Sequence, residues 1–139
     1  MSQGTRDTNS PQETEAAAAE LAARLEPGDV VLVSGELGAG KTTFVRGVAQ
    51  GTGSPAPVAS PTFQLVRIYP GRVQLAHVDL YRVENSMELR DLGLEELAQE
   101  GAVVVEWGDR LEVDGAALIE IEPLGGDRRL IRTTRDLGH

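Results

Sequence analysis

The chain has 139 residues, the size of one ordinary domain, so a second catalytic module is not expected beside the first. Its 22 acidic and 13 basic side chains give a formal net charge of −9. Such a surface repels phosphate backbones, which argues against direct binding of DNA or RNA through a basic patch. The absence of cysteine excludes disulfides, thiolate nucleophiles and cysteine-ligated zinc, and fits a reducing compartment. Only one of the basic residues, Lys41, is a lysine.

The composition along the chain predicts a polar, disordered lead over residues 1–11, a single domain over 12–135 and a short tail over 136–139. The lead lacks the apolar centre of a secretion signal. No stretch approaches the ~20 apolar residues that a membrane span needs. We therefore expect a cytoplasmic protein that does not contact a membrane.

Apolar periodicity and breaker residues predict helices and strands in alternation. We expect a first helix capped by Thr14 and running to about Leu25, a strand at 30–33 and a helix at 41–50. Next come strands at 62–69 and 72–80 joined in a hairpin, a short helix from 85 or 86 to 89, and a turn at 95–98. The chain is expected to end with a strand at 103–105 and a second hairpin of 118–122 and 129–133. The continuous valine-rich runs are typical of strands buried on both faces of a parallel sheet.

Residues 35–42, GELGAGKT, match the phosphate-binding pattern G-x-x-x-x-G-K-[ST] between a predicted strand and a predicted helix. The glycines let successive backbone N–H groups point at phosphate oxygens, and the helix adds the positive end of its dipole. Lys41 supplies a charge for the β- and γ-phosphates, and the Thr42 hydroxyl is a Mg²⁺ ligand. The alternative is a glycine-rich surface turn. The residues expected to bind nucleotide here are Leu37, Gly38, Ala39, Gly40, Lys41, Thr42 and Thr43.

Two carboxylates, Asp79 and Glu106, each follow an apolar strand. Ligands of open α/β sheets bind at the carboxyl ends of the strands, so both are candidates for holding Mg²⁺ or acting on the attacking water. Either could instead be an ordinary strand-end carboxylate that faces solvent. The sequence does not divide the two roles between them.

Each of the other candidate site residues has two possible interpretations. Trp107, the only tryptophan, packs either in the core or against the nucleotide or a partner. His77, in the middle of a strand, is more often a core histidine than a catalytic one. A loop after the phosphate-binding helix is either a switch-like segment that senses the γ-phosphate or a simple turn; its residues are Ser60, Pro61 and Thr62.

Several nucleotide-using classes are disfavoured. A GTPase needs an Asn-Lys-x-Asp segment to read the base, and no lysine exists beyond Lys41 to form one. The chain shows no lid or acceptor domain for a small-molecule kinase. It also has no hydrophobic arm of a transport ATPase.

Four blocks together resemble the TsaE family, also called YjeE, of bacterial ATPases required for threonylcarbamoyladenosine modification of tRNA. The resemblance runs from about Thr14 to Thr133. The blocks are residues 36–44 (ELGAGKTTF), 60–63 (SPTF), 77–82 (HVDLYR) and 106–107 (EW).

This resemblance implies a P-loop NTPase-like, three-layer α/β fold whose central parallel sheet is flanked by antiparallel strands. It implies slow hydrolysis of ATP with Mg²⁺, and TsaD and TsaB as partners that carry the transferase chemistry and contact tRNA. Carried onto this chain, Lys41, Asp79 and Glu106 are catalytic, while Thr42, Asp79 and Glu106 are metal ligands. Trp107 lies near the nucleotide or a partner. The segment before Thr14 and the Arg128-Arg129 pair are candidates for contact with adenine.

The leading hypothesis is a Mg²⁺-dependent ATPase that serves as the energy-using switch of a tRNA-modification complex. A nucleotide-gated adaptor, whose ATP occupancy matters but whose hydrolysis does not, belongs to a different class. A small phosphotransferase is the third.

Overall fold

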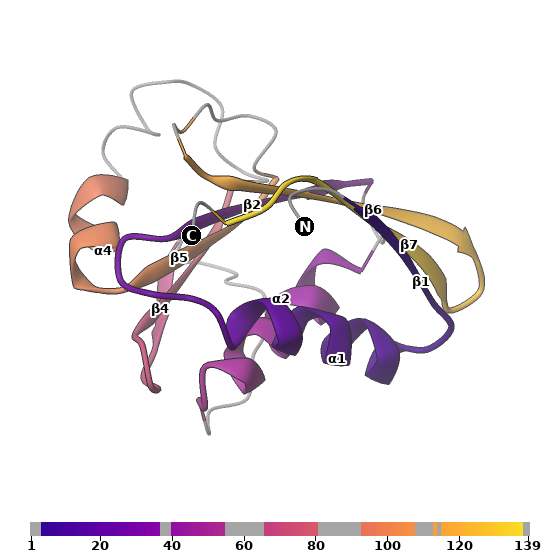
Figure 1. The fold of residues 1–139 in the computed structure, drawn as a ribbon, viewed down its shortest axis with the longest axis horizontal. Coiled ribbons are helices and arrows are strands. Elements are labelled where there is room, and N and C mark those ends of the chain that lie inside the picture. The colour runs from indigo at the N-terminus through magenta and orange to yellow at the C-terminus, as the bar shows by residue number, and fades with distance from the viewer. Residues whose placement is uncertain are drawn as a thin grey trace.

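The computed structural model describes residues 4–36, 40–54, 66–80, 93–107, 113 and 115–137. They form a seven-stranded sheet with helices packed on its faces (Figure 1). The elements are β1 Gly4–Thr8, α1 Pro11–Ala22, β2 Val30–Gly35, α2 Lys41–Gly51, β3 Val66–Tyr69, β4 Leu75–Asp79, α4 Leu94–Glu100, β5 Ala102–Glu106, β6 Ala117–Gly125 and β7 Arg128–Arg135.

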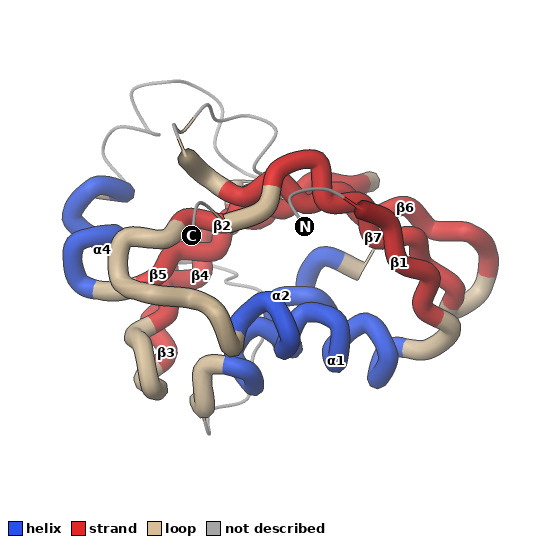
Figure 2. Tube along the Cα trace, viewed as in Figure 1, coloured by secondary structure: helices blue, strands red, loops and turns tan. Residues whose placement is uncertain are grey.

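The sheet has a parallel centre and antiparallel edges, as expected. Its strand order is β1-β7-β6-β2-β5-β4-β3 (Figure 2). The neighbours β6, β2, β5 and β4 pair in parallel. At one edge β3 pairs antiparallel with β4, and at the other β7 pairs antiparallel with both β6 and β1. The predicted three-layer α/β fold is therefore confirmed.

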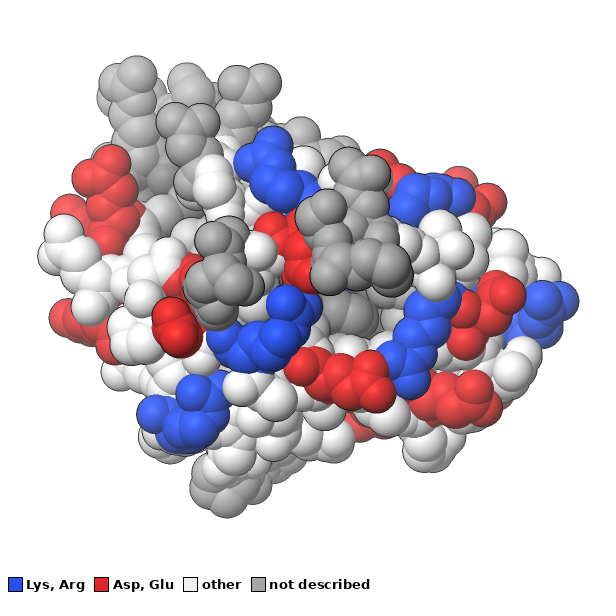
Figure 3. Space-filling model, viewed as in Figure 1, with Lys and Arg blue, Asp and Glu red and all other residues white. Residues whose placement is uncertain are grey.

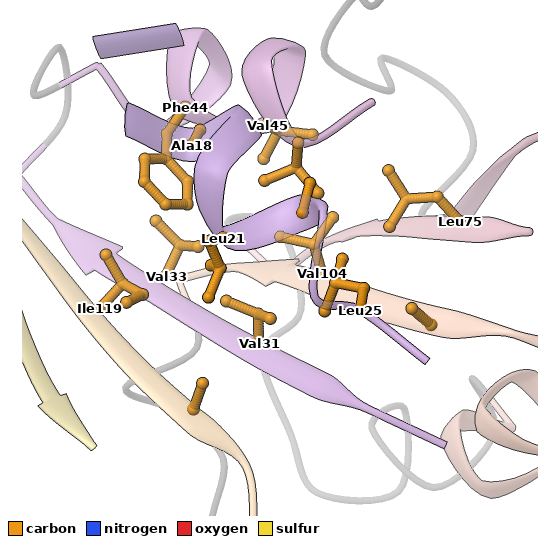
Figure 4. Packing of buried hydrophobic residues seen from close by; sticks show 14 of the residues in the cluster. Ala18, Leu21, Leu25, Val31, Val33, Phe44, Val45, Leu75, Val104 and Ile119 are labelled. Carbon is orange, nitrogen blue, oxygen red and sulfur yellow. The ribbon is translucent and has the colours of Figure 1, made fainter. Parts of the chain in front are cut away.

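Alternate residues of the central strands pack into two separate hydrophobic clusters, one on each face of the sheet. Because both faces are buried, the sequences of these strands are continuously apolar. Val31 and Val33 of β2 pack with α1 and α2 on one face of the sheet (Figure 4). Leu32, between them, belongs to the second cluster, where α4 contributes Leu94 and Leu97. Because side chains alternate along a strand, every residue of a central strand can be assigned to one face.

The first helix begins earlier than the sequence predicted. Ser10 caps it, since its hydroxyl accepts a hydrogen bond from the Glu13 N–H at 3.1 Å, and Pro11 occupies the first turn. The predicted cap, Thr14, is instead buried inside the helix with its hydroxyl 2.7 Å from that of Thr8. The predicted end at Leu25 is also wrong, because the helix stops at Ala22.

The polar segment expected to be a disordered lead contains strand β1 over Gly4–Thr8. This strand pairs antiparallel with β7, and Arg6 contacts Glu20 of α1. The prediction is therefore wrong for these residues. No apolar pattern predicts this strand, because four of its five residues are exposed.

The later elements follow the sequence more closely. Both predicted hairpins are confirmed, as β3–β4 and β6–β7. Where only a turn was expected around residues 95–98, the chain forms helix α4. The first part of the predicted strand at 62–69 and the short helix ending at Leu89 lie outside the described residues.

None of the helices within the described ranges is long and apolar enough to cross a membrane. On the face drawn in Figure 3, the basic side chains lie in separate groups with acidic side chains between them.

Helices α1 and α2 approach closely because α2 has glycine at the contact. A Cβ on Gly47 would lie 2.3 Å from the Glu15 carbonyl oxygen and 2.7 Å from the Ala18 Cβ, both of α1. The backbone of one helix therefore rests against the other, which fixes α2 and the loop that precedes it against the sheet.

We expect Gly47→Ala to lower the free energy of unfolding by ~1–3 kcal/mol, the usual range for overpacking, although alanine is the better helix former. Urea denaturation followed by circular dichroism measures the change. The control is Arg46→Ala, at a half-buried position of the same helix. A Gly47→Ala protein as stable as the wild type would show that the helices separate at little cost.

Candidate nucleotide-binding site

The glycine-rich loop leads from β2 into the first turn of α2. Gly40 precedes the helix with φ of 102°, a backbone conformation that favours glycine. Gly40 has no side chain with which to cap this end of α2, and the N–H groups in the first turn of a helix are suited to binding a phosphate. Leu37, Gly38 and Ala39 lie outside the described residues, and their expected contacts with nucleotide stay a prediction.

Lys41 is held at the mouth of this loop with only 5% of its surface exposed. Its ammonium donates hydrogen bonds to the carbonyl oxygens of Gly35 at 2.8 Å and Glu36 at 2.7 Å. It also lies 3.9 Å from the centre of the Trp107 ring, a cation–π arrangement. The structure thus brings together the lone lysine and the lone tryptophan.

Trp107 follows β5 in a conformation that bulky residues rarely adopt. Its φ is 62°, and among the described residues no other non-glycine residue has a positive φ. Such a conformation costs about 1–3 kcal/mol and persists where the surroundings impose it. Here it accompanies the placing of the indole ring against Lys41.

Glu106, the last residue of β5, is buried and joins three elements. Its Oε1 accepts a hydrogen bond from the Thr42 hydroxyl of α2 at 3.1 Å, with Oε2 at 3.4 Å from the same hydroxyl. Its Oε2 lies 2.5 Å from Nε2 of His77 on β4. The carboxylate therefore does not face solvent, which removes that alternative for Glu106.

Asp79 lies beside Glu106 at the end of the neighbouring strand. The parallel register pairs the two residues directly, so their side chains project from the same face of the sheet. That face is the one covered by α1 and α2, since Val104 of β5 packs there and Glu106 is two residues further along. Asp79 is partly exposed. Two carboxylates thus lie on one face at the ends of neighbouring strands, and Glu106 contacts Thr42.

These oxygens suit a hard cation. A threonine hydroxyl that donates its proton to Glu106 keeps lone pairs for a metal ion. Mg²⁺ prefers oxygen ligands and is commonly held by one or two carboxylates together with substrate phosphates. Thr42, Glu106 and Asp79 therefore form a donor set that fits Mg²⁺ beside a phosphate group.

Arg129 of β7 lies beside Gly40, at the start of α2. A Cβ on Gly40 would lie 3.3 Å from the Arg129 Nε, and both residues line a cavity of about 30 Å³. The cavity is lined by Pro11, Thr14, Gly40, Thr43, Asp127 and Arg129. Of the two arginines considered from sequence, Arg128 is exposed and Arg129 is the one beside the loop. The switch-like residues Ser60, Pro61 and Thr62 lie outside the described residues.

A phosphate-binding sequence between a buried parallel strand and a helix, with carboxylates at neighbouring strand ends, defines the class: a P-loop-type α/β protein. Residues 8–131 match the family model of the threonylcarbamoyl adenosine biosynthesis protein TsaE. The chain therefore belongs to the TsaE family of threonylcarbamoyladenosine biosynthesis proteins.

Individual relatives agree with this assignment. The chain is 42% identical to the tRNA threonylcarbamoyladenosine biosynthesis protein TsaE of Bacillus subtilis, over 91% of this chain and 82% of the relative. It is 40% identical to the protein of that name from Streptomyces coelicolor, over 85% and 76%. The crystal structure of YdiB from Bacillus subtilis superposes with a TM-score of 0.77 at 34% identity, covering 98% of this chain and 88% of YdiB.

The Thr42–Glu106 hydrogen bond yields a prediction about stability. We expect Thr42→Val to lower the free energy of unfolding by ~1–3 kcal/mol, because it leaves a buried carboxylate oxygen without its donor. Thr42→Ser keeps the hydroxyl and is the matched control. Denaturant titration measures both variants, and equal stability of the valine and serine proteins would show that the bond contributes nothing.

Proposed function

We propose that this protein is a Mg²⁺-dependent ATPase required for threonylcarbamoyladenosine modification of tRNA, and that it hydrolyses ATP as a switch in a complex with TsaD and TsaB. The observation that carries the proposal is the meeting of Lys41, Thr42, Asp79 and Glu106 at the carboxyl ends of adjacent parallel strands. The names of the relatives support the tRNA-modification role, which fits a cytoplasmic location.

The chemistry would follow from the placement of these residues. The phosphates of ATP would lie along the loop and the start of α2, and Lys41 would exchange its carbonyl contacts for phosphate oxygens. The bound Mg²⁺ would neutralise charge on the β- and γ-phosphates. Thr42 and Glu106 would hold the metal, since they already share a hydrogen bond. The more exposed Asp79 would orient the water that attacks the γ-phosphate in line.

The protein would act on tRNA only through its partners. A net charge of −9 and the mixing of acidic with basic groups seen in Figure 3 offer little to a phosphate backbone. A charge-stabilising arginine supplied by a partner is worth roughly 10³–10⁵ in rate for P-loop enzymes. The proposal therefore expects slow hydrolysis by the isolated chain and faster hydrolysis in the complex.

The decisive measurement is the steady-state rate of ATP hydrolysis by this protein with and without TsaD and TsaB. We expect the partners together to raise the rate by at least tenfold. A Lys41→Ala protein, which lacks the phosphate-binding ammonium, serves as the control for contaminating ATPases. Equal rates with and without the partners would contradict the switch.

Glu106→Gln separates the ATPase from the adaptor, because an amide keeps the shape but loses the charge. We expect ATP binding to weaken in the presence of Mg²⁺, and hydrolysis and tRNA modification to be lost together. Reconstituted modification assays measure the second effect. If modification survives without hydrolysis, the adaptor is correct. If a hydroxyl- or amine-bearing metabolite rather than a protein accelerates ATP consumption, the protein is a phosphotransferase.

A further inference from the structure

His77 is a fully buried polar residue in strand β4. It lies in the middle of β4, exposes none of its surface, and is flanked by the buried Ala76 and Val78. Burying an imidazole in such a place is unfavourable unless its nitrogens are hydrogen-bonded. The sequence favoured a core histidine, and its burial agrees, but within the described part of the chain its one hydrogen-bond partner is Glu106, a residue of the candidate site.

That contact is the 2.5 Å approach of Nε2 to Glu106 Oε2. An ionised carboxylate can only accept, so Nε2 carries the proton and donates it. The other ring nitrogen, Nδ1, is buried and has no hydrogen-bond partner within the described ranges. Leaving such a group unsatisfied is unfavourable. The ring packs on Tyr69 of β3, with centroids 6.3 Å apart and planes at 29°.

The two carboxylate oxygens of Glu106 therefore have different nearest hydrogen-bond donors. Oε2 contacts His77 and lies 3.4 Å from the Thr42 hydroxyl, while Oε1 lies nearer to that hydroxyl, at 3.1 Å. The terminal torsion of a glutamate has broad preferences and does not by itself set the plane of the carboxylate. Two donors from different elements, β4 and α2, do set it.

We propose that His77 is a positioning residue: its Nε2–H holds the Glu106 carboxylate so that Oε1 stays at the Thr42 hydroxyl, where Mg²⁺·ATP is bound. This inference rests on the proposed function, because it assigns His77 a role toward the metal nucleotide. His77 itself does not touch the substrate. Partners that orient a ligating group commonly change metal affinity by about 10–100-fold when they are lost.

The first test examines the hydrogen bond without any ligand. The chain has two histidines, so its imidazole NMR signals are few and readily assigned. We expect His77 to be protonated at Nε2, with the proton signal far downfield. In Glu106→Gln this signal should move upfield, because the charged acceptor is gone. A His77 protonated only at Nδ1, or a signal that ignores Glu106→Gln, would overturn the proposal.

The second test examines the role through two replacements at His77. His77→Gln offers an amide N–H at similar reach, while His77→Met fills the space without a donor. Calorimetric titration with ATP at increasing Mg²⁺ needs no hydrolysis. We expect His77→Met to raise the Mg²⁺ concentration for half-maximal binding by ~10-fold or more, and His77→Gln to restore much of it.

The outcomes separate the possible failures. Equal losses in the two variants, or no loss in a folded His77→Met protein, would overturn the positioning role. If His77→Met does not fold, the positioning role is judged from two other results: the Mg²⁺ dependence of ATP binding by His77→Gln compared with wild type, and the His77 NMR signal. If the wild-type protein binds ATP without any dependence on Mg²⁺, the proposed function fails. The NMR signal then still decides whether His77 holds Glu106.

Discussion

The parallel pairing of β2 with β5 is the constraint on which the site depends. Its register places Val33 opposite Glu106, two residues before Gly35 opens the phosphate-binding loop. The loop and the carboxylate therefore leave the sheet at the same edge and on neighbouring strands. The pairing of β5 with β4 then adds Asp79 beside Glu106. One set of backbone hydrogen bonds thus aligns residues that lie far apart in the chain.

The site concentrates polar groups where the rest of the sheet is apolar. Lys41, His77 and Glu106 are each at least 95% buried, and each loses contact with water on folding. Trp107 adds an unfavourable backbone conformation next to them. Buried polar groups and strained backbone lower the free energy of unfolding, so other contacts must offset this loss. The close contact of α1 with α2 at Gly47 and the two apolar clusters are such stabilising contacts.

Much of the fold could be predicted because its signals are local. The loop motif, the buried valine runs and the turns at Pro70-Gly71 and Gly125-Gly126 each lie within a few residues of sequence. Strand β1 could not be found in this way, because it is polar and exposed and is held by its pairing with β7. The start of α1 does carry a local signal, since Ser10 is followed by Pro11 and by Glu13, and the prediction of Thr14 as the cap overlooked it.

The sequence by itself determined the chemistry of the site: one lysine in a phosphate-binding pattern, a threonine after it, and carboxylates at the ends of two strands. The tertiary structure decided how these groups meet. It directed one oxygen of Glu106 to Thr42 and the other to His77, set Lys41 against Trp107, and brought Arg129 beside Gly40. Residue types follow from the chain, whereas distances between side chains follow from strand register and helix packing, which no local pattern specifies.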